Sequence, residues 1–174
     1  MHASAILAVV VALQVASTSP PERTPDLRNV LNNNAALSSI EVLYRVEGQV
    51  IDVHGDGTVL KQSTRQQLPL LPTCKGMVAL VDVRRLLEVM LVEQFFDLPQ
   101  KSYVLINEDW RTLRMHSISI KAAGGSAKRD FSAGEYDGKR QEIPENFARV
   151  EKAITELESK AISSKTHCTV DRPF

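Results

Sequence analysis

The stretch from Gly76 to Pro99, GMVALVDVRRLLEVMLVEQFFDLP, decides the fold of this chain. From Val78 onward it predicts one strongly apolar helix, which ends at Phe95–Pro99 because proline cannot continue a helix. Asp82 is placed either to cap this helix or to lie in its first turn, where a carboxylate suits the positive end of the helix dipole. Strand-like sequence flanks the stretch on both sides, so we expect it at the centre of the core.

The predicted helix is apolar on two sides. A spacing of 3.6 residues per turn places one apolar group on a single face: Val83, Leu86, Leu87 and Met90. A second group lies on nearly the opposite side: Val89, Val92 and Phe96. The first face is expected to pack on a sheet, and the second is covered either by another helix or by a partner.

Three short antiparallel strands are predicted before this helix. Apolar and polar residues alternate from Ile40 to Val46, which is the period of a half-buried strand, and Val50–Val53 resumes the extended pattern. Gly55-Asp56-Gly57 predicts a turn before a third strand at Thr58–Leu60. Residues 62–77 are expected to form a loop.

A hairpin is predicted after the helix. Leu113–Lys121 is strand-like, but its apolar residues change phase, which suggests a bulge near His116-Ser117. Gly124-Gly125 is a hairpin turn signal, and Ala127–Ser132 is expected to pair back on the first strand.

The last predicted element is an amphipathic helix that opens at Pro144, a residue suited to the first helical position. Its apolar residues form one stripe: Phe147, Val150, Ile154, Leu157 and Ala161. Two pairs spaced i,i+4 are expected on the outside, Glu145 with Arg149 and Glu156 with Lys160.

The resulting order, β-β-β-α-β-β-α, predicts a single α+β domain over residues 40–162. We expect one antiparallel sheet of about five strands with both helices packed on one face. Residues 18–39 are rich in Pro, Asn, Ser and Thr and are expected to be a flexible linker, with one short helical turn around Leu27–Leu31. Residues 163–174 are expected to form an irregular tail.

The N-terminus carries an apolar run at Ala5–Ala16, followed by small residues. The run is shorter than the roughly 20 residues that a membrane helix needs, and it matches the apolar region of a secretory signal. Residues 1–17 are therefore expected to be a signal peptide, although Met1–Ser4 lacks Lys and Arg. The alternatives are an N-terminal membrane anchor and a buried helix. We favour export, to the extracellular space or the periplasm.

Cys74 and Cys168 are the two cysteines of the chain. An exported protein with an even number of cysteines favours a disulfide, and closing a loop of this length would contribute about 4.5 kcal/mol in the chain-entropy model. The alternative is two unpaired thiols, one in a loop and one in the tail.

Composition excludes several function classes. Lys plus Arg equals Asp plus Glu at 21 each, and the charges are interspersed along the chain. A protein that binds nucleic acid or an anionic membrane surface carries a basic patch, so we expect neither partner here. A membrane contact is expected only through an uncleaved N-terminal segment.

The sequence offers little that resembles a reactive site, and we assign no catalytic residue, cofactor or metal site. Asp52-x-His54-x-Asp56 is a weak match to a calcium loop, because its twelfth position is Ser63 rather than Glu. A cryptic enzyme site would need Cys74 or Cys168 to meet a histidine such as His116.

Two aromatic residues, Tyr103 and Trp110, mark either a binding edge or a cover over the end of the sheet.

Several motifs resemble a family of uncharacterised exported bacterial domains. They are Leu86-Leu87, Phe95-Phe96-Asp97-Leu98-Pro99, Asp109, Ser117-Ile118-Ser119-Ile120 with its Gly-Gly hairpin, and Pro144-x-x-Phe147. The same order of elements, over roughly Ile40 to Ile162, is similar more loosely to the emfourin-type inhibitors of thermolysin-like metalloproteases. The loop at Gln62–Gly76, the N-terminal segment and the C-terminal tail depart from those small inhibitors.

These observations favour an exported, non-enzymatic binding module whose partner is an unidentified protein, with a protease as the partner that the resemblance implies. A structural domain of the cell envelope, tethered by residues 5–16, and an enzyme with a cryptic Cys/His site are the alternatives.

Export predicts a processed N-terminus. We expect mass spectrometry of the protein from a secreting host to show a chain that begins at Thr18, after cleavage at Ser17. An intact Met1 in a membrane fraction would instead support the tethered alternative.

Overall fold

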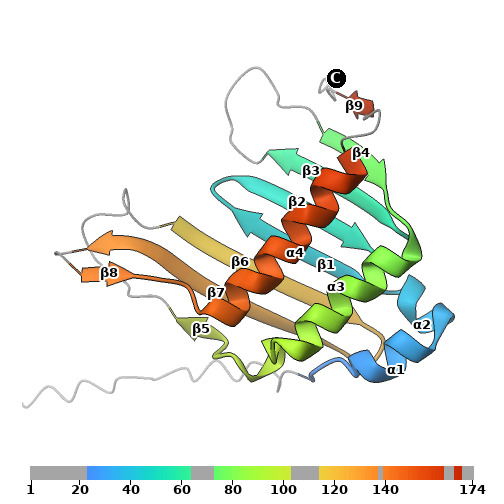
Figure 1. Ribbon diagram of the computed structural model, residues 1–174, viewed down its shortest axis with the longest axis horizontal. Helices are drawn as coiled ribbons and strands as arrows, with labels where there is room; N and C mark the ends of the chain where they lie inside the picture. The colour runs from blue at the N-terminus through green and yellow to red at the C-terminus, as the bar shows by residue number, and fades with distance from the viewer. Residues whose placement is uncertain (1–22, 64–72, 103–113, 137–138, 163–166, 170–174) are drawn as a thin grey trace, which may run out of the picture.

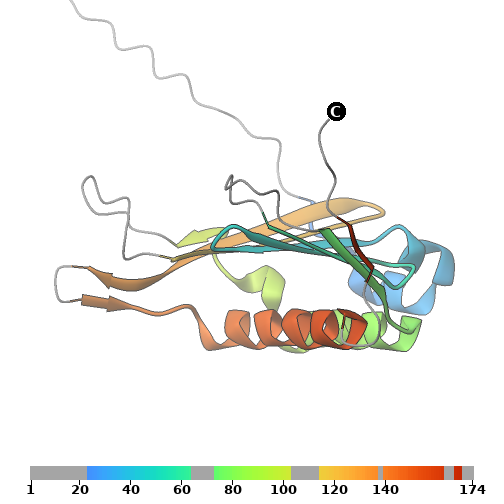
Figure 2. The ribbon, with the colours of Figure 1, turned by 90° about the horizontal axis from the view of Figure 1, so that it is seen from above.

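The computed structural model describes residues 23–63, 73–102, 114–136, 139–162 and 167–169. One antiparallel sheet forms the centre of the molecule, and two long helices, α3 (Leu80–Val92) and α4 (Glu145–Ile162), lie side by side on one of its faces. Figures 1 and 2 show the two layers. The predicted α+β class, with an antiparallel sheet and both helices on one face, is confirmed.

The sheet is larger than the five strands expected, and the order of strands and helices differs from the predicted β-β-β-α-β-β-α. Its strands are β1 (Glu41–Val46), β2 (Gln49–His54), β3 (Thr58–Ser63), β4 (Thr73–Met77), β5 (Lys101–Ser102), β6 (Arg114–Ala122), β7 (Gly125–Tyr136), β8 (Lys139–Gln141) and β9 (His167–Thr169). They are arranged in the order β5-β7-β6-β1-β2-β3-β4-β9, with β8 paired to β7. Neighbours are antiparallel except for β5 and β7, which are parallel.

Two predictions about these strands were wrong. β4 lies within the segment expected to be a loop, where Cys74, Lys75 and Gly76 gave no alternating pattern, and β9 lies in the tail expected to be irregular. β9 is the edge strand and β4 lies between it and β3, so both are held by pairing with neighbours rather than by burial of an apolar face.

The predicted bulge in β6 is also absent. β6 pairs with β1 and with β7 in one unbroken register, and His116 lies on the same face as Ile118 and Ile120. The apolar residues seemed to change phase because the polar side chain of His116 occupies a position that faces the core. The Gly-Gly hairpin is confirmed, since β6 and β7 meet at Ala122 and Gly125 and Gly124 has a φ of 95°.

Helix α3 is shorter than the predicted helix over Val78–Pro99. It ends at Val92, and Gln94 adopts a left-handed conformation with φ 52° before a short 3-10 turn, η1 (Phe95–Asp97). Asp82 lies in the first turn of the helix rather than at its cap.

The two apolar sides of α3 differ in burial. The face predicted to meet the sheet is buried at every position: Val83, Leu86, Leu87 and Met90. On the other side Val92 is 77% exposed, while Val89 and Phe96 pack partly against the core. The second side of α3 is therefore only partly covered.

Helix α4 follows its predicted pattern. The whole predicted stripe is buried, and Phe147 contacts two other aromatic rings, with centroid distances of 4.7 Å to Phe131 and 6.4 Å to Phe95. The predicted ion pair between Arg149 and Glu145 is present at 2.6 Å. Lys160, expected to pair with Glu156, reaches Asp82 on α3 instead, at 2.7 Å.

Most of the predicted linker at residues 18–39 is folded. Helices α1 (Leu27–Asn32) and α2 (Asn34–Ser38) are capped by the side chains of Asp26 and Asn33, which accept hydrogen bonds from backbone N–H groups. Three of their apolar residues enter the core: Leu27, Val30 and Leu37. The predicted helical turn around Leu27–Leu31 is therefore confirmed by α1, while the flexible-linker prediction is wrong for the rest of the described segment up to Ser38, where Asn33 serves as a cap.

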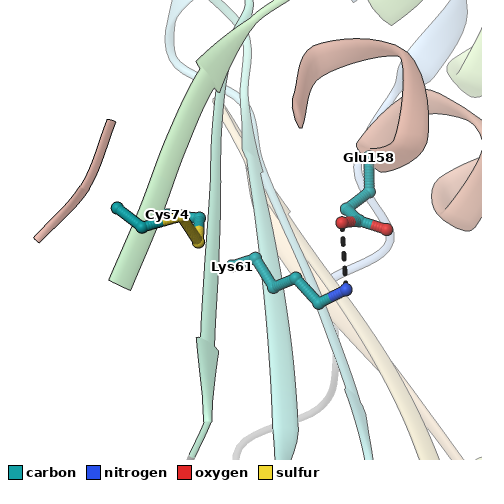
Figure 3. The surroundings of a disulfide bond; sticks show 4 residues. Lys61, Cys74 and Glu158 are labelled. Atoms are coloured by element: carbon teal, nitrogen blue, oxygen red, sulfur yellow. Dashed lines mark hydrogen bonds and ion pairs between the residues drawn. A yellow bond between two sulfur atoms is a disulfide. The ribbon is translucent and has the colours of Figure 1, made fainter. Parts of the chain in front are cut away.

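Cys74 and Cys168 form a disulfide. They are directly opposed residues of the β4–β9 pair, so the bond fastens the last described strand to the sheet (Figure 3). The alternative of two unpaired thiols is thereby excluded.

Within the described part of the chain, no helix is both long enough and apolar enough to cross a membrane. The N-terminal run at Ala5–Ala16 lies outside the described residues.

Breaking the disulfide tests its contribution to stability. Cys168→Ser is expected to lower the free energy of unfolding by roughly 4 kcal/mol, because the bond closes a long loop in the unfolded chain. Cys74→Ser should have the same effect, since each variant removes the same bond. Urea unfolding of both variants measures the loss, and a change below about 1 kcal/mol would contradict the entropic account.

Candidate functional site

A cluster of three polar side chains lies between the sheet and the first half of α4. Glu151 of α4 accepts a hydrogen bond from the hydroxyl of Tyr44 on β1, and its Oε1 lies 2.8 Å from Nδ1 of His116 on β6. The strand register brings the two sheet residues together, because Tyr44 and Val46 pair with Ile118 and His116 respectively. All three side chains are largely buried.

The proton affinities in this cluster follow from its geometry. Burial works to raise the pKa of Glu151, but hydrogen bonds from His116 and Tyr44 outweigh it and hold the pKa below the ordinary value of 4.5. Burial, followed by the hydrogen bond to Glu151, raises the pKa of the Tyr44 hydroxyl well above its ordinary value. Glu151 is thus an ionised acceptor and Tyr44 a permanent donor.

Further polar contacts hold α4 along both of its flanks. On the flank nearer the sheet, Oε1 of Glu158 accepts a hydrogen bond from Nζ of Lys61 on β3 at 3.1 Å (Figure 3). On the flank nearer α3, Arg149 reaches Glu93 at 2.7 Å. Together with the Lys160–Asp82 pair, these contacts fix the position of α4 and assign the Tyr44–His116–Glu151 cluster a structural role.

A hollow of about 660 Å³ lies beside the segment that leads from β8 into α4. Its lining is Arg114, Ala133, Gly134, Arg140, Gln141, Glu142 and Ile143; we call it the β8 hollow. Figure 2 shows β7 and β8 extending beyond the two-layer body at this end. Nε of Arg114 lies 2.6 Å from Glu47, and Nε of Arg140 lies 2.9 Å from Glu142. Two guanidinium groups therefore line one open cavity.

A second depression, of about 440 Å³, lies where α3 ends. Its lining includes Glu93, Gln94, Asn146 and Arg149. The amide of Asn146 donates to the carbonyl of Glu93 at 3.1 Å, and Gln94 donates its N–H to Leu91, so these groups terminate the helix. We assign this depression to helix capping.

The face of the sheet opposite α3 and α4 bears no described helix (Figure 2). Three aliphatic side chains point to it and are half-buried: Leu43, Val50 and Leu60. We call this the uncovered face.

Asp52 lies between Leu43 and Leu60 across the strands of the uncovered face. Its Oδ2 is 3.1 Å from Nε2 of His54, while its Oδ1 is buried without a hydrogen-bond partner among the described residues. Burial raises the pKa of Asp52, and His54 opposes that effect. This carboxyl group is therefore held in an unfavourable environment, unlike Glu151.

The residues considered for chemistry from the sequence do not converge. Cys74 is in the disulfide, and three strands separate β4 from β6, which places Cys74 roughly 19 Å from His116 across the sheet. A site that joins a free thiol of Cys74 or Cys168 to His116 is therefore not formed.

The calcium-loop match resolves into a turn. The carboxylate of Asp56 accepts the N–H of Thr58 at 2.8 Å, and Asp52 pairs with His54. Among the residues that the structure describes, no group of three or more His, Cys, Asp or Glu is arranged to hold a metal ion.

Other candidate residues lie outside the described ranges, among them Tyr103, Asp109 and Trp110. Sequence reasoning missed Tyr44, Glu151 and Arg114. The signal that could have identified them was a polar side chain at an inward position of a strand or near the apolar stripe of a helix.

Comparisons of the chain with protein-family models, with curated proteins and with solved structures found no match.

The lowered pKa of Glu151 makes stability depend on pH. In the range below 4.5 the unfolded chain binds more protons than the folded one, so the stability that this carboxylate contributes is present above about pH 4.5 and is lost as the pH falls through the lowered pKa. We expect Glu151→Gln to lower the free energy of unfolding by about 1–3 kcal/mol at neutral pH and to flatten its dependence on pH below 4.5. Urea unfolding across this pH range measures both effects.

Asp52→Asn is the matched control, with the opposite sign. A raised pKa means that the stability from protonated Asp52 is present below its ordinary pKa of 3.8 and is lost as the pH rises through the folded-state value. The charged group therefore destabilises the protein at neutral pH, and the amide should raise the free energy of unfolding there. A loss of stability in Asp52→Asn comparable to that in Glu151→Gln would contradict this assignment.

Proposed function

We propose that this chain is an exported, non-enzymatic binding module that docks a protein partner on its uncovered face. The observation that carries the proposal is the half-buried group Leu43, Val50 and Leu60 on a sheet whose described helices all lie elsewhere. A two-layer domain normally keeps large aliphatic side chains on the covered face, and an apolar group on the other face is typical of an interaction surface.

The disulfide supports the exported setting of this proposal. Disulfides form and persist in oxidising compartments, and Cys74–Cys168 fastens a three-residue strand that would be a weak edge element without it. The N-terminal apolar run supplies the matching export signal.

Asp52 supports the interaction surface independently. The carboxyl group is expected to destabilise the free protein at neutral pH, because burial between two leucines raises its pKa. Residues that lower stability in this way tend to be found at functional surfaces. Here the Asp52 carboxyl group would fix the orientation of the partner on an otherwise apolar surface.

The sequence resemblance to emfourin-type inhibitors suggests the class of partner, a secreted metalloprotease of the thermolysin type. Titration of purified thermolysin with the oxidised protein tests it, with peptidase activity and size-exclusion chromatography as readouts. We expect a 1:1 complex and loss of activity. Full activity with the protein in large molar excess would contradict this partner class.

Substitution on the uncovered face tests where the partner binds. The double variant Leu43→Gln, Leu60→Gln is expected to weaken the complex roughly tenfold or more, because central apolar contacts dominate the energy of protein interfaces. Leu80→Gln, Val81→Gln is the control, since these residues are exposed on α3. Equal loss in both variants would contradict the assignment to this face.

A further inference from the structure

We propose that the partner docked on the uncovered face presents a lysine or arginine side chain to Asp52, with apolar residues on either side of it. This inference rests on the proposed function and names the chemistry of the partner at that same surface. It follows from the place of Asp52, which lies directly opposite Leu43 on β1 and Leu60 on β3. A partner that covers these two leucines therefore covers the carboxyl group as well.

Covering Asp52 with a purely apolar surface would be costly. Its side chain is 19% exposed in the free protein, and its Oδ1 is already buried without a hydrogen-bond partner among the described residues. Its Oδ2 meets a histidine, His54, which is charged only when it is protonated. A carboxylate that loses its remaining contact with water needs a countercharge or hydrogen-bond donors, and a basic side chain of the partner supplies both.

The charges around Asp52 do not supply that countercharge. Burial raises the pKa of Asp52, His54 opposes that effect, and the charge of Glu41 raises the pKa further. Glu41 is half-buried on the same face, in register with His54. Within the described ranges, no lysine or arginine forms an ion pair with Asp52 or Glu41. The cations of this face are all exposed: Arg45, Lys75, Lys121 and Lys128.

The apolar residues of the face favour a long basic side chain over a small cation. Lysine and arginine have stems of several methylene groups, which pack along apolar surface while the charged end reaches a polar group. On the uncovered face the stem would lie on Leu43 or Leu60, with the charged end over Asp52. The remaining aliphatic side chain, Val50, is left to meet an apolar neighbour of that basic residue.

Three short peptides test the proposal: acetyl-Leu-Lys-Leu-amide, the same peptide with the uncharged isostere norleucine in place of lysine, and the same peptide with glutamate. Titration of isotope-labelled protein, followed by the amide chemical shifts of Leu43, Asp52 and Leu60, measures binding even at millimolar affinity. We expect the lysine peptide to bind roughly tenfold more tightly than the norleucine peptide, and the glutamate peptide to bind more weakly than either.

Substitutions assign the preference to particular carboxylates. Asp52→Asn should abolish the preference for lysine over norleucine, and the variant is expected to fold because the amide removes a poorly solvated charge. Glu41→Gln should reduce the preference in part. Glu88→Gln is the matched control, because it removes the same charge from an exposed position on α3 and should leave the preference unchanged. An equal loss in Glu88→Gln and Asp52→Asn would overturn the proposal.

The dependence on pH separates a basic partner residue from a neutral one. A cation needs the ionised carboxylate, so affinity for the lysine peptide should be present above the raised pKa of Asp52 and fall as the pH drops through it. His54 and Glu41 also titrate, so the profile is compared with that of Asp52→Asn, which retains both. Tighter binding of the lysine peptide on acidification would contradict the proposal, because a neutral surface is what protonated Asp52 favours.

These outcomes distinguish the inference from the proposed function. Equal binding of the lysine and norleucine peptides at the uncovered face would leave the docking surface standing and refute the basic residue. If none of the three peptides shifts these amides at millimolar concentration, the surface is refuted and the inference with it. If the lysine peptide binds preferentially but no thermolysin complex forms, the inference stands and the partner class alone is refuted.

Discussion

The position of α4 is the constraint on which the rest of the structure depends. Its apolar stripe closes the core over the sheet, with Phe147 packed against Phe131 and Phe95. Polar contacts on either flank then fix its rotation and its position along the sheet, since Glu151 and Glu158 hold it to the strands and Arg149 and Lys160 hold it to α3. At its far end the helix approaches β4 so closely that a Cβ on Gly76 would lie 2.3 Å from the carbonyl oxygen of Ala161. The helix layer is therefore located at both ends and along both sides.

This placement explains why the two faces of the sheet differ. The inward residues of β1, β2 and β6 meet α3, α4 and the short helices α1 and α2, and they form one continuous core. The outward residues of the same strands form a mixed polar surface, on which Leu43, Val50 and Leu60 are only partly shielded from solvent. Asp52 illustrates the conflict, because a carboxylate among leucines loses solvation without gaining a full set of donors.

Periodicity was a sound guide wherever a residue's burial follows from its own element. The stripe of α4 and the inner face of α3 were predicted at every position, and the hairpin turn at Gly124 follows from its backbone conformation. Elements that are stabilised mainly by contacts with neighbouring elements were not predicted. β4 and β9 are stabilised by pairing and by a disulfide between residues 94 apart in sequence. Helices α1 and α2 are stabilised by burial of Leu27, Val30 and Leu37, which look isolated in the sequence. The buried polar cluster was not predicted for the same reason, since Tyr44, His116 and Glu151 come from three separate elements.

The error over β6 carries physical information. Its inward positions run Arg114, His116, Ile118 and Ile120, from charged through polar to apolar, without any break in register. A strand that leaves a core must change the polarity of its inward residues, because the layer above it ends before the strand does. Alternation seemed to fail at His116, which contacts Glu151 in the first half of α4, and Arg114, two residues before His116, lines the β8 hollow. A loss of hydrophobic alternation in a long central strand therefore indicates either a bulge or the rim of a cavity. Because β6 pairs continuously with both neighbours, the loss of alternation here marks the rim of a cavity.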